Sequence, residues 1–189
     1  KPVAMVEVKY DDRPHVLPID AEGTVLPPAY FTADDISNYL RIAADHLRPS
    51  GLVGDPWGDS KVVGAAKLAG LFDGIPWKEM GLYRIEVTMN PRDSTVVYYV
   101  ILKERPEIRV LWGSEPGKET IDEQIAPEKL KIIHIILRLL ADSLKNEIPT
   151  TAARTGPRLL KTAMVVKVKN LTAVYVMIVL MHPVINEIA

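Results

Sequence analysis

Cysteine is absent from this chain, which excludes disulfide bonds, thiolate metal sites and cysteine nucleophiles. An excess of charge is also missing, because 23 Lys and Arg residues nearly balance 24 Asp and Glu residues. Nucleic-acid binding depends on a basic surplus that neutralises phosphates, so we expect no nucleic acid as a partner. The longest apolar run, Leu171 to Met181, is shorter than the roughly 18 to 20 residues of a membrane-spanning helix, and His182-Pro183 closes it. We expect a buried or edge strand there.

Sequence motifs of catalysis and of nucleotide binding are missing as well. There is no Gly-x-Ser-x-Gly elbow, and no Gly-Lys-Ser/Thr follows the glycine-containing stretch Pro49 to Ser60. The histidines lack the spacing that places two imidazoles on one metal ion; they are His15, His46, His134 and His182. We therefore expect no catalytic residue, no metal site and no cofactor.

One stretch keeps an enzymatic alternative open. Trp57, in the loop Pro49 to Ser60, could form a platform for a ligand, although a tryptophan in such a loop more often covers the edge of a core. Asp55 and Asp59 could pair across a cleft beside it. A deep cleft lined by these side chains would favour a periplasmic hydrolase or a glycan-binding domain.

The N-terminal part has the pattern of a β-hairpin. Short β-branched runs flank the turn-forming segment Asp20 to Gly23, whose glycine can adopt the positive φ that such a connection requires. The expected strands are Val16-Leu17 and Thr24 to Leu26. Pro18 is expected to break the first strand, and Pro27-Pro28 ends the second because proline has no N–H for a ladder.

Three segments have helical signals. The first runs from Thr32, a capping residue, to Leu47, and Asp34-Asp35 complements the dipole of its first turn. The second runs from Asp59 to Phe72 with a broad apolar face and slim residues suited to packing on a sheet. The third spans Ala126 to Leu144, where we expect His134 at the edge of the core.

Between the second and third helices the period of the apolar residues changes to two. The runs Leu82 to Met89, Thr95 to Leu102 and Glu107 to Trp112 are joined by short turn-rich segments, which predicts an antiparallel meander. The predicted fold class is α+β, with a mixed or antiparallel sheet packed against two or three helices. We expect Ile85 in the core, beneath the helix that ends at Phe72.

The C-terminal part changes character. Residues 148–186 contain no acid, while basic residues accumulate beside two apolar, strand-like runs. These basic residues are Arg154, Arg158, Lys161, Lys167 and Lys169. Such a charge asymmetry favours an acidic partner or an anionic surface, and the alternative is a solvated loop before an ordinary last strand.

A series of short motifs resembles the FtsQ/DivIB family of bacterial cell-division proteins. In that family a POTRA subdomain ends in a strand, a hairpin follows, and a helix, a meander and a further helix come next. The matching segments are Pro2-Val3-Ala4, Asp20 to Gly23 with Leu26-Pro27, Leu82 with Ile85 and Val87, Val110 to Gly113, and Glu128 to Leu130. The resemblance covers about residues 1–144.

The resemblance implies a division of the chain into three parts. Residues 1–14 would be the last strand of a truncated POTRA-like subdomain, and residues 15–145 the β subdomain. Residues 146–189 would be a basic and apolar extension with a candidate final edge strand. The motif residues expected to be structural are Pro2, Val3, Asp20, Gly23, Pro27, Trp112 and Gly113.

The resemblance also implies a function without catalysis. The chain would be the extracytoplasmic part of a single-pass inner-membrane protein whose anchor precedes Lys1, a first residue that already suggests a portion of something longer. It would bind other division proteins, such as FtsB/FtsL-like coiled-coil membrane proteins, through a sheet edge. The residues expected at this edge are Tyr175, Val176, Ile178, Lys167 and Lys169.

Overall fold

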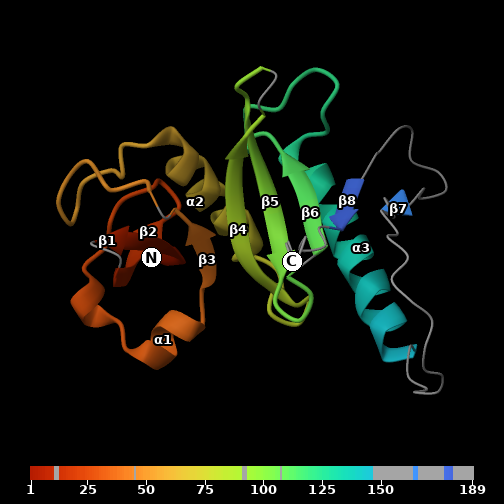
Figure 1. Cartoon of the computed structure of the whole chain (residues 1–189), viewed down its shortest axis with the longest axis horizontal. Helices are drawn as coiled ribbons and strands as arrows, with labels where there is room; N and C mark the ends of the chain where they lie inside the picture. The colour runs from red at the N-terminus through yellow and green to blue at the C-terminus, as the bar shows by residue number, and fades with distance from the viewer. Residues whose placement is uncertain are drawn as a thin grey trace, which may run out of the picture.

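The computed structural model describes residues 1–10, 13–44, 46–90, 93–106, 108–146, 164–165 and 177–180. The described strands form one mixed sheet in the order β2-β1-β3-β4-β5-β6-β8-β7 (Figure 1). The strands are β1 (Pro2–Tyr10), β2 (Arg13–Asp20), β3 (Leu40–Ala43), β4 (Leu82–Met89), β5 (Val96–Leu102), β6 (Ile108–Gly113), β7 (Met164–Val165) and β8 (Met177–Leu180). The helices are η1 (Pro28–Tyr30), α1 (Ala33–Ser37), α2 (Ser60–Phe72) and α3 (Ala126–Asn146).

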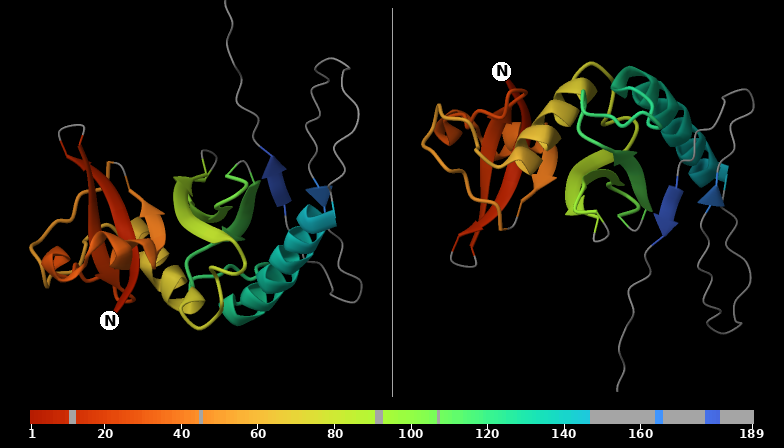
Figure 2. Two further views of the ribbon diagram at one scale, coloured as in Figure 1. Left: turned by 90° about the horizontal axis from the view of Figure 1, so that it is seen from below. Right: turned by 90° about the horizontal axis from the view of Figure 1, so that it is seen from above.

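The predicted α+β fold class is confirmed. Strands β4, β5 and β6 form the expected antiparallel meander, and β1 and β2 form an antiparallel hairpin. The short strand β3 lies between these two units and pairs in parallel with both β1 and β4. Helices α2 and α3 lie on the same side of the sheet in both views of Figure 2, so one face carries the core.

The hairpin was predicted between Val16-Leu17 and Thr24 to Leu26, but the structure forms it between β1 and β2. Its strands are β1 and β2, and β2 continues through Pro18 to Asp20, so the predicted break at Pro18 is wrong. The segment after the turn at Asp20 to Gly23 contributes two isolated bridges, Ile19 with Val25 and Thr24 with Pro56, instead of a strand. Pro18 is tolerated because β2 is an edge strand, where an outward-facing residue needs no N–H.

The first predicted helix is also corrected. Its capping box is present, since Thr32 Oγ1 accepts from Asp35 N at 3.2 Å and Asp35 Oδ2 accepts from Thr32 N at 2.9 Å. The helix nevertheless ends at Ser37, and Leu40–Ala43 forms β3 instead of continuing to Leu47. Burial between two parallel neighbours outweighs helix propensity in this four-residue segment.

Helix α2 packs across the middle of the sheet. Asp59 caps it by accepting from Lys61 N at 2.8 Å, as the predicted start requires. Its buried face combines large residues, Leu68 and Phe72, with small ones, which lets the helix lie close to β1, β3 and β4. Helix α3 begins at Ala126 as predicted, and His134 is half-buried on it.

A single row of apolar side chains crosses the sheet under α2. Cross-strand pairs connect Val6 to Ile42, Ile42 to Ile85, Ile85 to Val100 and Val100 to Val110. All five side chains are fully buried, 0% exposed in each case. A β-bulge between positions 82 and 84 of β4 keeps the apolar residues on both sides of it on the core face.

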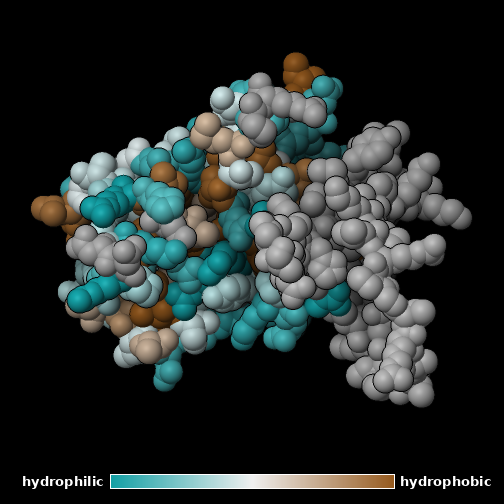
Figure 3. Space-filling model, in the orientation of Figure 1, coloured by the Kyte–Doolittle hydropathy of each residue, from teal (hydrophilic) through white to brown (hydrophobic). Residues whose placement is uncertain are grey.

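The opposite face of the sheet carries ion pairs beside the buried Met5 and Ile101. Glu7 on β1 reaches across β3 to Arg84 on β4, with Oε2 and NH2 2.7 Å apart, and also lies 3.9 Å from Arg41 Nε. Arg109 on β6 pairs with Glu86 at 2.9 Å. The Glu7 pairs fasten the short strand β3 to its neighbours, whereas the Arg109–Glu86 pair spans β5. Hydrophilic residues gather over the middle of this face in Figure 3.

We predict that Ile85→Ala destabilises the protein by about 2–5 kcal/mol, because it leaves a cavity in the middle of the apolar row. Urea denaturation, with Met89→Ala as the control, measures the loss. Met89 lies on the same strand but is 47% exposed, so its truncation should cost well under half as much. A loss below about 1 kcal/mol for Ile85→Ala would contradict the proposed core.

Candidate functional site

The sheet has two ends, and the outer strand at the first end, β2, offers few free backbone groups. Pro14 and Pro18 are four residues apart in β2, so their backbone nitrogens face the same edge of the strand. Neither nitrogen carries a hydrogen that could be donated there. That side is the outer one, since Pro18 O accepts from Leu26 N at 2.8 Å and Asp20 N donates to Thr24 O at 3.1 Å. Of the outward amides from Pro14 to Pro18, only Val16 keeps an N–H. This edge is therefore closed to strand addition.

At the other end of the sheet, two short strands of the same chain follow β6. Beyond the meander, β8 pairs antiparallel with β6 through Ile108↔Leu180, Arg109↔Val179 and Val110↔Ile178. Ile178, an expected edge residue, is thus the backbone partner of Val110 on β6. On its outer side β8 is paired with β7 at Met177 and Ile178. The other expected edge residues, Tyr175, Val176, Lys167 and Lys169, lie outside the described residues.

The turn after β6 is held by a nearly buried lysine of α3. Lys129 Nζ lies 2.5 Å from Glu123 Oε1, donates to Trp112 O at 3.3 Å and sits 4.9 Å from the centre of the Trp112 ring. Glu123 Oε1 also accepts from Ser114 N at 2.8 Å. A Cβ at Gly113, where φ is +98°, would come within 2.1 Å of that oxygen, so only glycine fits. Trp112 and Gly113 thus have the structural role that the motif implied.

A second carboxylate in the same loop is tied to α2. Glu115 is 8% exposed and pairs with Lys67 at 2.7 Å and with Lys118 at 2.8 Å. Burial alone raises the pKa of Glu115, but the hydrogen bonds and charges of the two lysines outweigh it and hold the pKa below the ordinary value of 4.5. Burial, followed by the charges of Glu115 and Asp59, raises the pKa of the neighbouring Tyr98 phenol. The loop from β6 to α3 is therefore locked to both helices by ion pairs.

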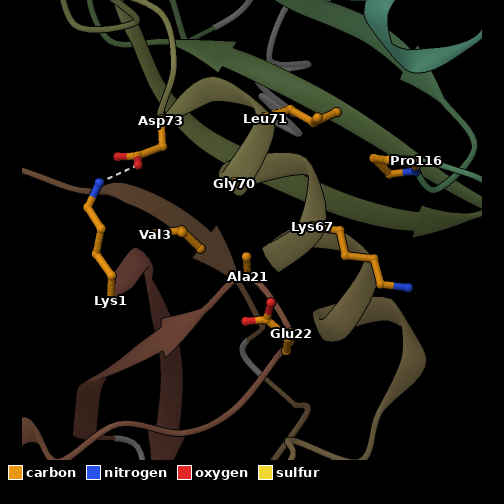
Figure 4. Close-up of a pocket in the computed structure, with 9 residues that line it drawn as sticks. All are labelled: Lys1, Val3, Ala21, Glu22, Lys67, Gly70, Leu71, Asp73 and Pro116. Atoms are coloured by element: carbon orange, nitrogen blue, oxygen red, sulfur yellow. Dashed lines mark hydrogen bonds and ion pairs between the residues drawn. The ribbon is translucent and has the colours of Figure 1, made fainter.

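A shallow, open depression of about 520 Å³ lies between α2 and the start of the chain (Figure 4). Its floor is small and apolar, with Ala21 and Gly70 in the middle. Figure 4 shows Lys1 and Asp73 pointing toward each other on one side, where they form an ion pair, while Lys67 extends away on the other. Lys1, Asp73 and Lys67 are occupied by ion pairs, while the side chain of Glu22 also lines the depression.

The N-terminal motif residues are structural. Pro2 begins β1 and pairs with Asp20. The next pair is Ala4 with Ile19, so Val3 lies in a bulge where the register shifts. Asp20 Oδ1 accepts from Thr24 N at 2.7 Å and from Glu22 N at 3.1 Å, which fixes the turn. At Gly23, φ is +85° and an added Cβ would lie 2.8 Å from Val63 Cγ2 on α2. Pro27 precedes η1 at its capping position.

The loop around Trp57 does not form a ligand platform. Trp57 is fully buried and donates its backbone N–H to Gly23 O at 2.8 Å. Asp59 is occupied in capping α2, and Asp55 Oδ2 accepts from Leu52 N at 2.9 Å. The cleft that would favour a hydrolase or a glycan-binding domain is therefore not built by these three residues.

Sequence reasoning did not find the residues that hold the candidate edge. Neither Glu115 nor Glu123 is singled out in the sequence, and Lys129 is included there only within the motif Glu128 to Leu130, because the sequence does not show which segments meet. Among the described residues, no group of three or more metal-ligating side chains converges, and no helix is long and apolar enough to cross a bilayer. Comparisons with protein-family models, with curated proteins and with solved structures found no match.

We predict that Glu123→Ala destabilises the protein by about 3–5 kcal/mol, because the nearly buried Lys129 loses its counter-charge. Glu128→Ala is the matched control: it breaks an exposed pair with Lys131 on the same helix and should cost at most about 1 kcal/mol. Chemical denaturation compares the two. Equal losses would show that the Lys129 pair does not hold the turn.

We also predict a loss of stability in acid. Hydrogen bonds from Lys129 and Ser114 outweigh the effect of burial and lower the pKa of Glu123 below 4.5, as the two lysines do for Glu115. A carboxyl with a lowered pKa in the folded state stabilises the protein above its unfolded pKa, and this contribution is lost as the pH falls through the folded pKa. The free energy of unfolding should therefore decrease below pH 4.5. A Glu115→Gln/Glu123→Gln variant should show a shallower decrease over the same range; an unchanged slope would contradict the assignment.

Proposed function

We propose that this chain is a non-catalytic scaffold of the bacterial cell-division apparatus, of the FtsQ/DivIB type, that binds partner division proteins through one end of its sheet. The observation that carries the proposal is the difference between the two ends. The β2 edge is closed by Pro14 and Pro18, whereas β6 pairs with an added antiparallel strand. The motifs that resemble this family, and their order along the chain, supply the biological setting.

Binding would occur by strand addition beyond the meander. Backbone hydrogen bonds would supply affinity, and alternate side chains of the partner strand would supply selectivity. On the core face, the apolar row of buried side chains reaches Val110 on β6, so an apolar side chain of the partner would suit this end of the sheet. The basic residues Lys167 and Lys169 would steer an acidic partner segment toward this end, an effect that weakens with salt.

The proposed setting is the outer side of the inner membrane. A single-pass anchor upstream of this chain would hold it in the periplasm, close to other anchored division proteins such as FtsB/FtsL-like coiled-coil proteins. Tethering on one surface raises the effective concentration of such partners, so strand addition of modest intrinsic affinity would suffice.

We predict that Ile178→Pro abolishes capture of the extracytoplasmic segments of FtsB/FtsL-like proteins, measured by biolayer interferometry. Proline removes one backbone donor from β8 and disturbs its pairing at the candidate edge. The control is Val16→Pro, which removes an outward donor at the closed edge and should leave both folding and capture unchanged.

The experiment has two outcomes that would contradict the proposal. In the first, Val16→Pro weakens capture and Ile178→Pro does not; this result would assign the binding edge to β2. The other is the absence of capture by the unmodified chain at low salt, where electrostatic steering is strongest. Circular dichroism of each variant establishes that the meander is still folded.

A further inference from the structure

One carboxylate on the sheet is shared by two arginine side chains. It belongs to Glu7 on β1 and lies on the face turned away from α2, which we call the polar face. Arg84 NH2 is 2.7 Å from Glu7 Oε2, and Arg41 Nε is 3.9 Å from Glu7 Oε1. Arg41 and Arg84 are paired positions of the parallel strands β3 and β4, which lie next to each other in Figure 1. One carboxylate therefore faces two guanidinium groups.

The two guanidinium groups have more hydrogen-bond donors than this carboxylate takes up. A guanidinium has five N–H donors and no acceptor. The Arg84 side chain donates to Glu7 alone, and its Nε is buried without a partner among the described residues. No described residue accepts a hydrogen bond from Arg41, since 3.9 Å is too long for one, although its side chain is only 16% exposed. Buried polar groups normally have partners, so these free donors require an explanation.

The charges of the polar face are also out of balance. Glu86 on β4 pairs with Arg109 on β6 at 2.9 Å, so it is not available to the two arginines beside Glu7. The cross-strand neighbours of Glu7 are Val16 and Ala43, which carry no charge. Three arginines thus share two glutamates, and one positive charge is in excess. A single excess charge matches a singly charged anion.

We propose that Arg41 and Arg84 form a binding site for a carboxylate group. The guanidinium fork matches the two oxygens of a carboxylate, and both side chains reach solvent, at 16% and 33% exposure. The Tyr83 ring, whose centre lies 5.4 Å from Arg84 Cζ, restrains one of the two groups. A doubly charged anion fits less well, because Glu7 stays beside the site and repels the second charge. The site is on β3 and β4 and does not depend on the proposed function.

The Nε–Hε group of Arg84 reports on the site by NMR. It is buried, so its hydrogen exchanges slowly with water, and Arg84→Lys assigns its signal by removing it. Sodium acetate replaces sodium chloride at constant ionic strength and neutral pH. We expect a saturable shift of the Arg84 signal, whereas the signal of Arg109, which has its own glutamate, stays in place. Inorganic phosphate should bind more weakly than acetate.

Two variants separate a binding site from general screening of charge. Arg41→Lys keeps the charge but removes the fork, so acetate should bind at least about tenfold more weakly. Glu7→Gln removes the competing negative charge, so acetate should bind several-fold more tightly. Circular dichroism checks that both variants are folded, and the comparison of Arg84 with Arg109 in the unmodified chain decides the question if either is not.

Four results would overturn the proposal. They are no shift with acetate, equal shifts of Arg84 and Arg109, an unchanged acetate affinity in folded Arg41→Lys, and tighter binding of phosphate than of acetate.

Competition identifies the source of the carboxylate. A division-protein segment that displaces acetate would place an acidic side chain of that partner in the site. A segment that is captured but leaves acetate bound would assign the site to a small carboxylate molecule, and both results support the proposal. Absence of capture with an intact acetate response would contradict the proposed function alone, so the two failures are distinguishable.

Discussion

The apolar row that crosses the sheet is the interaction on which the rest of the structure depends. Val6, Ile42, Ile85, Val100 and Val110 lie at one level of five neighbouring strands and are fully buried under α2. The row joins the hairpin, the parallel strand β3 and the meander into one core, so a shift of register in any strand would expose its neighbours. Beyond β6 the backbone pairing continues from Val110 to Ile178 on β8.

The two ends of the sheet follow from different local constraints. At β2, prolines in two outward positions remove the donors that an incoming strand needs, while the turn at Asp20 uses most of the remaining groups. At β6, the Lys129–Glu123 pair fixes the turn that follows Gly113 and leads into α3. The β2 edge is closed, whereas the end beyond β6 already carries β8 and β7, so the sheet has one direction in which to extend.

Periodicity predicted much of this fold. The meander, α2 and α3 have long patterns of period two or near 3.6, and the structure has them within two residues of the expected bounds. The segment around Leu40 was misread as helix because Leu40, Ala44 and Leu47 are spaced three to four residues apart, a spacing that a short buried parallel strand can share. The locks at Glu115 and Glu123 could not be predicted, since each joins segments that are distant in sequence or depends on a turn geometry that composition does not define.

The central claim is that the sheet extends only beyond β6. Hydrogen–deuterium exchange of the backbone, with and without the extracytoplasmic segments of division-protein partners, tests it most directly, because strand addition protects the amides of the edge that receives the strand. We expect new protection in β8 and β6 and unchanged exchange at Val16 in β2. New protection confined to β2, or to the polar face without any change in β6 and β8, would contradict this account.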